Sequence, residues 1–396
     1  MSIRENTVQG FKASAVAAGL KKDKSLDLAL IFSERESAAA GVFTNNKVKA
    51  APVIISREHV LNGSARAIVA NAGNANACTG KTGLDDARRT TGLLAEQLGI
   101  QPDEVLVAST GVIGEPLNIN AISGAVPSLV KALSPDGMLL AARAIMTTDS
   151  FPKMSYFYGR AGGQPYRILG ISKGAGMIMP NMATMLSFIL TDIRVDSRDL
   201  KRALLSSVET TFNRITVDGD TSTNDMVLVM ANGMAGNRAL SEAGYRDFKK
   251  GLETVMGELA HMMVRDGEGA TKLITIEIKG ALSSSDAIKA ARTVANSCLV
   301  KTAFYGKDPN WGRIMAALGR ADIEMKEESV DIWVDDVQIV AGGLGKGAEA
   351  EKRAAEIMAG EEFTLTIDLH LGDYQDRIIT CDLTHEYVTI NADYRT

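Results

Sequence analysis

The feature that most constrains the fold of this chain is the alternation of short apolar runs with amphipathic stretches along its length. The apolar runs are bounded by turn residues and predict strands at Leu28–Phe32, Ala67–Ala70, Val105–Ala108, Ile168–Ile171, Met226–Met230, Leu273–Ile278, Val330–Val334 and Thr364–Leu369. The amphipathic stretches predict helices at Leu84–Leu98, Leu200–Val208, Tyr245–Val264 and Asp286–Ala295. Strands that alternate with helices predict an α/β fold of layered sheets, although periodicity does not reveal the strand order.

Composition narrows the class of protein further. With 396 residues, of which 45% are hydrophobic, the chain is long enough for two domains or two closely packed halves. Acidic and basic residues are mixed and the formal net charge is −5, which argues against a nucleic-acid partner. The three cysteines are widely spaced, as expected for a reducing compartment. Neither an apolar leader nor a membrane-length apolar run occurs, so we expect a soluble cytoplasmic protein without membrane contact.

Two glycine-containing segments resemble phosphate-binding loops but depart from the pattern. Ala75–Thr82 follows a predicted strand and precedes a predicted helix, yet Ala75 stands where the first glycine belongs. In Gly342–Gly347 the residue after the lysine is a glycine, which offers no hydroxyl for magnesium. A plain loop is the favoured interpretation of both, and a nucleotide-sensing scaffold that uses Ala75–Thr82 is the non-enzymatic alternative.

Two further patterns compete with the main hypothesis. Gly170–Gly174 has the spacing of a serine-hydrolase nucleophile elbow, with His261, His370 and His385 downstream as candidate bases. The glycine-rich segment that follows cannot begin a clean helix, so a serine hydrolase is the second choice. Asp218–Asp225 is similar to a calcium-binding loop but lacks the glycine at its sixth position and the closing glutamate, and a capped turn is favoured there. No metal site is predicted.

The segment before Thr184 indicates a different chemistry. Lys173–Ala183 is rich in glycine and methionine, is broken by Pro180, and runs into the strand-like Thr184–Leu190. A threonine hydroxyl in a strained loop can attack the preceding carbonyl, here that of Ala183, and convert the amide to an ester that water cleaves. The new terminus would carry an α-amine with a reference pKa of about 8, which can take the proton of its own hydroxyl.

A wider set of motifs resembles the ornithine acetyltransferase family, also called glutamate N-acetyltransferase or ArgJ. The run Lys173–Leu186 is similar to the self-cleavage motif of that family. The resemblance covers essentially the whole chain and includes the segments Asn71–Ala77, Ser109–Gly114, Met146–Asp149, Val217–Asp225, Asp266–Lys272, Asp308–Arg313 and Asn391–Thr396.

The resemblance implies an autoproteolytic acyltransferase of arginine biosynthesis. Acetyl would pass from N2-acetyl-L-ornithine to L-glutamate by a ping-pong route through an acetyl-threonine ester on Thr184. The implied fold is a layered sandwich of paired β-sheets flanked by helices, of the N-terminal-nucleophile type found in ArgJ and DmpA. Cleavage between Ala183 and Thr184 would give an alpha chain, 1–183, and a beta chain, 184–396, interlocked as one core. Two such pairs would form a heterotetramer.

The resemblance also implies roles for particular residues. Thr184 would be the nucleophile, with the Thr110 hydroxyl and the Gly111 N–H as oxyanion donors. The substrate-binding set would be Thr147, Lys173, Thr184, Glu268, Asn391 and Thr396. Within it, Lys173 suits a carboxylate and Glu268 an ammonium group.

The motifs leave two alternatives for the acetyl donor and two for the acetyl acceptor. No cofactor is expected, and whether acetyl-CoA also donates acetyl, which would make the enzyme multifunctional, is not decided by any motif. Because the implied fold is shared with other self-processing enzymes, an N-terminal-nucleophile amidohydrolase or aminopeptidase is a further alternative. Transfer of acetyl to glutamate rather than to water would exclude that alternative.

Overall fold

The computed structural model describes residues 7–179 and 185–393 and divides the chain into two compact units. Unit 1 runs up to Asn213 and includes Asp220–Met263. Unit 2 consists of Arg214–Gly219 and the chain from Val264 onward. These boundaries do not coincide with the alpha and beta chains expected from cleavage after Ala183, because strands on both sides of that bond belong to unit 1.

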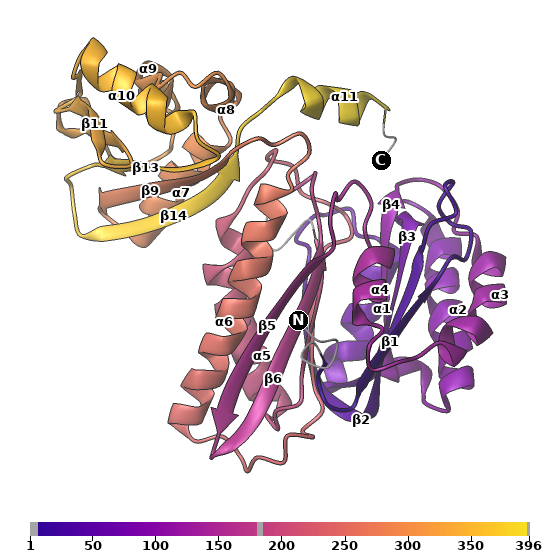
Figure 1. Cartoon of the computed structure of the whole chain (residues 1–396). Helices are drawn as coiled ribbons and strands as arrows, with labels where there is room; N and C mark the ends of the chain where they lie inside the picture. Colours follow the sequence, from indigo (N-terminus) through magenta and orange to yellow (C-terminus); the bar gives the residue numbers. More distant parts are fainter. Residues whose placement is uncertain (1–6, 180–184, 394–396) are drawn as a thin grey trace. The chain divides into compact units, whose positions relative to one another are not determined.

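Unit 1 is built on an eight-stranded mixed sheet (Figure 1). Its strands are β1 (Phe11–Val16), β2 (Leu28–Phe43), β3 (Ser64–Asn74), β4 (Val105–Val112), β5 (Lys153–Ala161), β6 (Gln164–Lys173), β7 (Leu186–Thr191) and β8 (Met226–Ala231). The order is β4-β3-β2-β8-β7-β6-β5, with β1 paired to β2. Two strands that follow the predicted cleavage bond, β7 and β8, therefore lie between strands that precede it.

The long strand β2 joins the two halves of this sheet. Its first half pairs with β1 and β3 and its second half with β8, and the register shifts between Phe32 and Ser37. Asn224, just before β8, donates to the carbonyls of Ala75 and Ser109, at 2.6 and 2.8 Å, although β2 and β3 separate β8 from β4. The sheet therefore folds over on itself, and buried side chains from both halves form one shared core.

Helices pack against both faces of this sheet. They are α1 (Ala51–His59), α2 (Gly80–Leu98), α3 (Ile119–Lys131), α4 (Met138–Ala144), α5 (Ser197–Thr210) and α6 (Glu242–Arg265). Isoleucine and leucine side chains of α1, α2 and α3 pack on the outer face of β3 and β4, whereas α4 contributes to the shared core. Figure 1 shows α6 running along β5 and β6. Gly170 allows this close approach, because a Cβ there would lie 2.6 Å from Leu259 and 2.7 Å from Val255 of α6.

Unit 2 has its own six-stranded sheet and core. The strands are β9 (Leu273–Ala281), β10 (Asp331–Val334), β11 (Val337–Ala341), β12 (Leu344–Gly345), β13 (Glu362–Asp368) and β14 (Tyr374–Cys381), in the order β12-β11-β10-β13-β9-β14. Its helices are α7 (Ser284–Ala295), α8 (Cys298–Tyr305), α9 (Trp311–Leu318), α10 (Ala348–Met358) and α11 (His385–Asp393). Alanines of α7 pack on the isoleucines of β9 to form the centre of this core.

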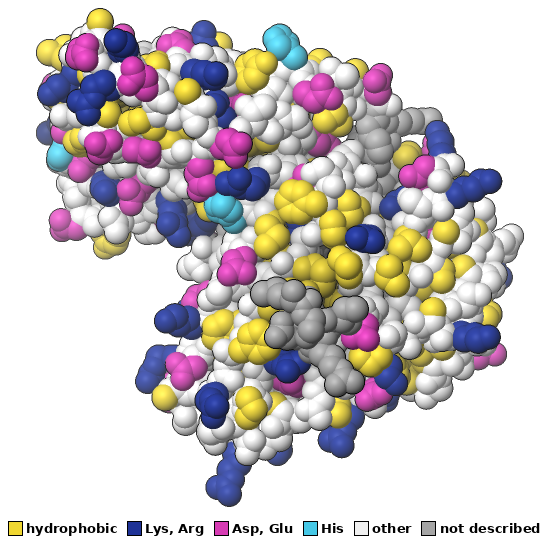
Figure 2. Space-filling view, viewed as in Figure 1, with side chains coloured by type: hydrophobic (Ala, Val, Ile, Leu, Met, Phe, Trp, Pro, Cys, Tyr) yellow, Lys and Arg dark blue, Asp and Glu magenta, His cyan; other side chains and the backbone are white. Residues whose placement is uncertain are grey.

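The predicted fold class is confirmed: both units are mixed sheets flanked by helices. Figure 2 shows acidic and basic side chains interspersed on the visible face of each unit, as the sequence led us to expect. Among the helices in the described part of the chain, none is long and apolar enough to cross a membrane.

Candidate active site

Three side chains of the predicted site meet at the ends of strands in unit 1. Thr110 lies near the end of β4, Lys173 is the last residue of β6, and Thr147 follows α4. The Nζ of Lys173 lies 2.7 Å from the Oγ1 of Thr147 and 3.4 Å from the Oγ1 of Thr110. The structure therefore brings Thr110, Thr147 and Lys173 together, although they come from distant parts of the sequence.

The direction of these hydrogen bonds matters for chemistry. An ammonium group only donates, so both threonine oxygens accept from Lys173. Each hydroxyl keeps its own proton to donate elsewhere, and a neighbouring positive charge favours donation to a negatively charged oxygen. Thr110 and Thr147 are thus suited to bind an oxyanion or a carboxylate.

A buried carboxylate, Asp149, lies next to Lys173 and was not among the predicted site residues. The side chains of Asp149 and Lys153 are both 0% exposed, and their charged atoms are 2.7 Å apart. The Oδ2 of Asp149 lies 3.9 Å from the Nζ of Lys173. Asp149 also accepts the backbone N–H of Gly174 at 2.6 Å and that of Thr147 at 3.0 Å. It therefore fixes the two segments that carry Thr147 and Lys173.

These three charged groups give the site a positive balance. Lys153 and Lys173 are cations and Asp149 is an anion, so the three groups together carry one net positive charge. Burial by itself would raise the pKa of Asp149, but the charges of Lys173 and Lys153, together with hydrogen bonds from Lys153 and Gly174, outweigh it and lower the pKa to about 2. Asp149 is accordingly ionised at neutral pH, and the remaining positive charge suits a substrate that carries a carboxylate.

Gly111 occupies a position that only glycine can fill. Its φ of +127° lies in a region that side chains disfavour, and an added Cβ would lie 2.4 Å from the carbonyl carbon of Gly73 and 2.6 Å from the nitrogen of Asn74. The pairing of β3 with β4 shifts register at the same point. The absence of a side chain thus lets the backbone turn that follows Thr110 pack directly against the end of β3.

In unit 2 the structure brings together two other predicted residues. Glu268 lies in the loop between α6 and β9, and Asn391 lies on α11. The Nδ2 of Asn391 donates to the Oε2 of Glu268 at 2.7 Å. The Oγ1 of Thr384 donates to the carbonyl of Gly269 at 2.7 Å, which holds the start of α11 against the same loop. The carboxylate of Glu268 keeps acceptor capacity for a further donor.

Ala183, Thr184 and Thr396 lie outside the described residues. On the near side of the predicted cleavage bond, Met177 has a left-handed φ of +56° and Ile178 forms an isolated bridge with Thr221. On the far side, β7 begins at Leu186, which pairs with Lys173 of β6 and with Met226 of β8. The strand that follows Thr184 in the sequence therefore begins beside Lys173.

The competing motifs form different structures. Ser172 lies inside β6, is fully buried and hydrogen-bonds to Ser187 at 2.8 Å, so it is not an exposed nucleophile on an elbow. In Ala75–Thr82, the Asn76 side chain accepts from Thr79 and donates to the carbonyl of Gly83, as in a capped turn. Residues 7–179 and 185–393 contain no cluster of three or more side chains suited to a metal.

Comparison with known proteins gives matches over nearly the whole chain. Residues 12–396 match the model of the ArgJ family. The chain is similar to the arginine biosynthesis bifunctional protein ArgJ of Geobacter sulfurreducens, at 54% identity over 391 residues, which cover 98% of this chain and 100% of the relative. It is also similar to the glutamate N-acetyltransferase of Methanocaldococcus jannaschii, at 46% identity over 399 residues, with 98% and 97% covered.

A solved structure shares part of the fold. The crystal structure of arginine biosynthesis bifunctional protein ArgJ from Bacillus halodurans aligns with a TM-score of 0.51 and 43% identity, and covers 53% of this chain and 100% of that one. The agreement in fold and in sequence along the chain confirms the family resemblance drawn from the motifs.

Proposed function

The chain belongs to the ArgJ family, and from that membership we propose that it transfers acetyl from N2-acetyl-L-ornithine to L-glutamate, releasing L-ornithine and N-acetyl-L-glutamate. The family match along residues 12–396 carries this proposal. The cluster of Thr110, Thr147 and Lys173 supports it, because it offers hydroxyl donors and a positive charge at the end of the strand that leads to Thr184.

We propose that the chain first cleaves itself between Ala183 and Thr184. In the first half-reaction the Oγ of Thr184 bonds to the acetyl carbon, and its proton passes to the α-amine of the same residue. The bond from the acetyl carbon to the ornithine nitrogen then breaks, and the proton held by the α-amine moves to that nitrogen. An acetyl ester remains on Thr184. The amine of glutamate attacks this ester in the second half-reaction, which restores the free hydroxyl.

The tetrahedral intermediate in each half-reaction carries a negative oxygen. We assign its stabilisation to the Thr110 hydroxyl and the Gly111 N–H, and loss of one such donor typically lowers the rate by about 10²–10³-fold. The hydrogen bond from Lys173 supports this role, since it leaves the hydroxyl proton of Thr110 available.

Both substrates share a carboxylate on the α-carbon, and the positive balance around Lys173 suits that group. We propose that Lys173 and Thr147 bind this carboxylate in either substrate. The substrates differ at the other end, where N2-acetylornithine carries an ammonium group. We assign this end to Glu268 and Asn391, and we assign Thr396 to the same substrate-binding set. The chemistry uses hydroxyl, amine and amide groups of the chain and requires no cofactor.

The role of Glu268 predicts an asymmetric effect of removing its charge. Glu268→Gln retains the shape of the side chain but loses the attraction for an ammonium group, so the KM for N2-acetylornithine should rise about tenfold. The KM for glutamate should change much less. Initial rates with each substrate varied in turn measure both constants. Glu386→Gln, which removes an exposed carboxylate from α11, is the matched control; an equal rise in both KM values for Glu268→Gln would contradict the assignment.

The decisive test of the proposed reaction follows the acetyl group. Incubation of the purified protein with acetyl-labelled N2-acetylornithine alone should place label on the fragment that begins at Thr184, detected by intact mass under denaturing conditions. Addition of glutamate should release the label as N-acetylglutamate. Release as free acetate, whether or not glutamate is present, would instead identify an amidohydrolase and reject the transferase.

We also propose that two processed pairs associate as a heterotetramer in the cytoplasm. Because the second-fragment strands β7 and β8 lie inside the sheet of the first fragment, each pair would stay associated after cleavage. Light scattering of the native protein, compared with a denaturing gel, tests the composition of the assembly.

A further inference from the structure

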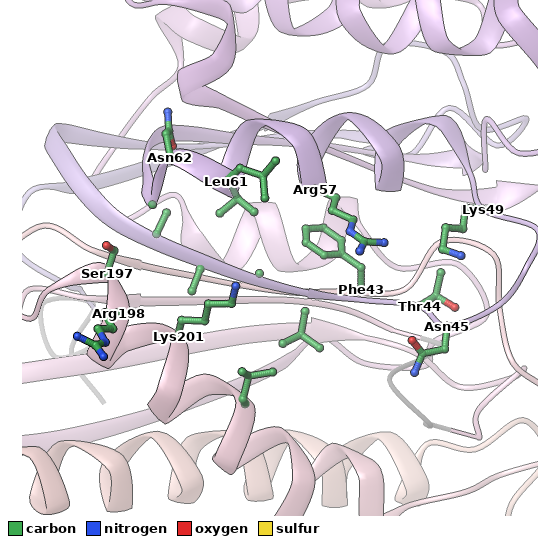
Figure 3. A pocket seen from close by; sticks show the side chains of 17 residues that line it. Phe43, Thr44, Asn45, Lys49, Arg57, Leu61, Asn62, Ser197, Arg198 and Lys201 are labelled. Atoms are coloured by element: carbon green, nitrogen blue, oxygen red, sulfur yellow. The ribbon is translucent and has the colours of Figure 1, made fainter.

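A groove on unit 1 is lined by residues outside the proposed active site (Figure 3). Its volume is about 620 Å³, within the usual range for small-molecule sites. The second half of β2 forms its floor, with α1 and the short 3₁₀ helix Val60–Asn62 along one wall and α5 along the other. The described residues that line it include neither Thr110, Thr147 nor Lys173, so the groove is separate from the cluster described above.

The charge of this groove is entirely positive. Its charged side chains are Lys49, Arg57, Arg198 and Lys201, and no carboxylate is among the residues that line it, all of which the structure describes. Figure 3 shows Arg57 and Lys201 reaching into the groove from opposite walls. Four cations along one groove repel one another, and a bound anion would relieve that repulsion.

The two carboxylates at the start of α5 have partners outside the groove. Asp196 caps the helix by accepting the N–H of Asp199 at 2.8 Å, and Asp199 pairs with Arg202 at 3.1 Å. Within residues 7–179 and 185–393, none of Arg57, Arg198 and Lys201 forms a salt bridge. Their charges are therefore available to a ligand.

The groove also exposes apolar surface. Leu61 is 79% exposed and Leu205 is 47% exposed, and they lie on opposite walls. A small inorganic anion would leave this apolar surface uncovered. A ligand that carries a planar ring as well as several negative charges would contact both kinds of surface.

We propose that this groove binds an organic phosphate of nucleotide size, with its phosphates on Arg57, Arg198 and Lys201 and its base against Leu61 and Leu205. Free nucleoside diphosphates and the nucleotide part of coenzyme A share this chemistry. Bidentate guanidinium contacts suit phosphate oxygens, and the lysines add point charges. Binding itself does not depend on the acetyl transfer proposed above.

One end of the groove gives a structural reason to test coenzyme A. Thr44 lines that end, and its backbone N–H donates to the carbonyl of Asp225 at 2.9 Å. Asp225 directly precedes β8, whose first residue Met226 pairs with Leu186 of β7. This end of the groove thus lies near the start of β8, which pairs with the start of β7. If the occupant is coenzyme A, this direction would place its thioester arm toward the proposed active site, an argument that rests on the proposed function.

Titration calorimetry of the full-length protein with ADP, coenzyme A and inorganic phosphate tests the proposal. We expect saturable binding of ADP or coenzyme A, and weaker binding of phosphate alone. Arg57→Glu combined with Lys201→Glu should weaken binding about tenfold or more, because two charge-assisted contacts are lost. Arg246→Glu combined with Lys250→Glu, an equal charge change on two exposed residues of α6, should leave the affinity unchanged. Transfer of acetyl from N2-acetylornithine to glutamate should persist in both double variants.

The two ligands distinguish two uses of the groove. Preference for coenzyme A over ADP would indicate a site for an acetyl donor, whereas equal binding would indicate a general nucleotide site. Absence of saturable binding by wild type, or equal binding by the double variant, would overturn the proposal. Light scattering tests whether the groove is instead a contact between copies of this chain. If the double variant loses its oligomeric state together with its ligand affinity, the groove is such a contact and the proposal fails.

Discussion

Replacing Thr184 with alanine is expected to leave one uncut chain of 396 residues and to abolish acetyl transfer. The hydroxyl is the nucleophile both for cleavage and for acetyl transfer, and the α-amine that serves as base exists only after cleavage. We expect kcat to fall by about 10⁴-fold or more, as when a covalent nucleophile is removed from other enzymes. A denaturing gel, intact mass and the acetyl-transfer rate measure the three consequences.

Thr184→Ser is the matched control for that experiment. Serine retains a hydroxyl at the same position, so cleavage and part of the activity should persist. The alanine variant should still fold, because the substitution lies outside β7 and β8, the two strands that pack between β2 and β6 in the sheet. A fully active wild-type protein that remains a single chain would contradict the mechanism, as would an alanine variant that is cut and active.

The same sheet order explains how cleaved wild type should behave. The sheet pairs β6 with β7 and β2 with β8, so two adjacent strands of the second fragment lie between strands of the first. The fragments should therefore elute as one species in native buffer and separate only in denaturant. Separation without denaturant would mean that the sheet does not survive cleavage.

Local sequence patterns predicted many elements of this fold but not their arrangement. Each predicted apolar run overlaps a strand, since buried strands require continuous apolar surface. The insertion of β7 and β8 between β2 and β6 was not predictable, because it depends on contacts between residues far apart in the chain. The register shift of β2 between Phe32 and Ser37 was not predictable either, because it depends on the neighbouring strand.

Some elements were missed for identifiable reasons. β5, Lys153–Ala161, lies at one end of the sheet order and mixes charged, aromatic and small residues, so its apolar signal is weak. α3 contains Pro127, which interrupts the usual helical pattern. The strand predicted at Thr184–Leu190 is β7 in the described part of the chain, where it begins at Leu186.

The residues of the candidate site were also predicted only in part. The family resemblance selected Thr110, Thr147 and Lys173. Their hydrogen bonds show that the three side chains lie together, which their spacing in the sequence could not predict. Asp149 had a signal, because it ends the motif that contains Thr147. Lys153 had none, since a lysine at the start of a strand is usually exposed, whereas here it is 0% exposed and paired with Asp149.

This buried pair leads to the second large expected effect. Asp149→Asn should lower the free energy of unfolding by about 3–5 kcal/mol, because it removes the carboxylate that compensates the buried charge of Lys153. Asparagine keeps the shape of the side chain and an oxygen for the N–H of Gly174, but its NH2 group replaces the oxygen that accepts the N–H of Thr147, so the loss combines the charge with that hydrogen bond. Urea unfolding at neutral pH measures it. The same variant should raise the KM for both substrates, since Thr147 and Lys173 lose their common anchor.

The charge explanation can be separated from a simple packing defect in two ways. Adding Lys153→Met to Asp149→Asn removes the buried cation as well and should restore most of the lost stability, whereas a packing defect would make the double variant worse. The pH dependence gives an independent check. The pKa of Asp149 is lowered from 3.8 to about 2, so its ionised form stabilises the fold above about pH 4, and this contribution is lost as the pH falls toward 2. The stability difference between wild type and Asp149→Asn should therefore narrow over that interval; a difference that stays constant from pH 7 to pH 2 would show that the charge of Asp149 is not its cause.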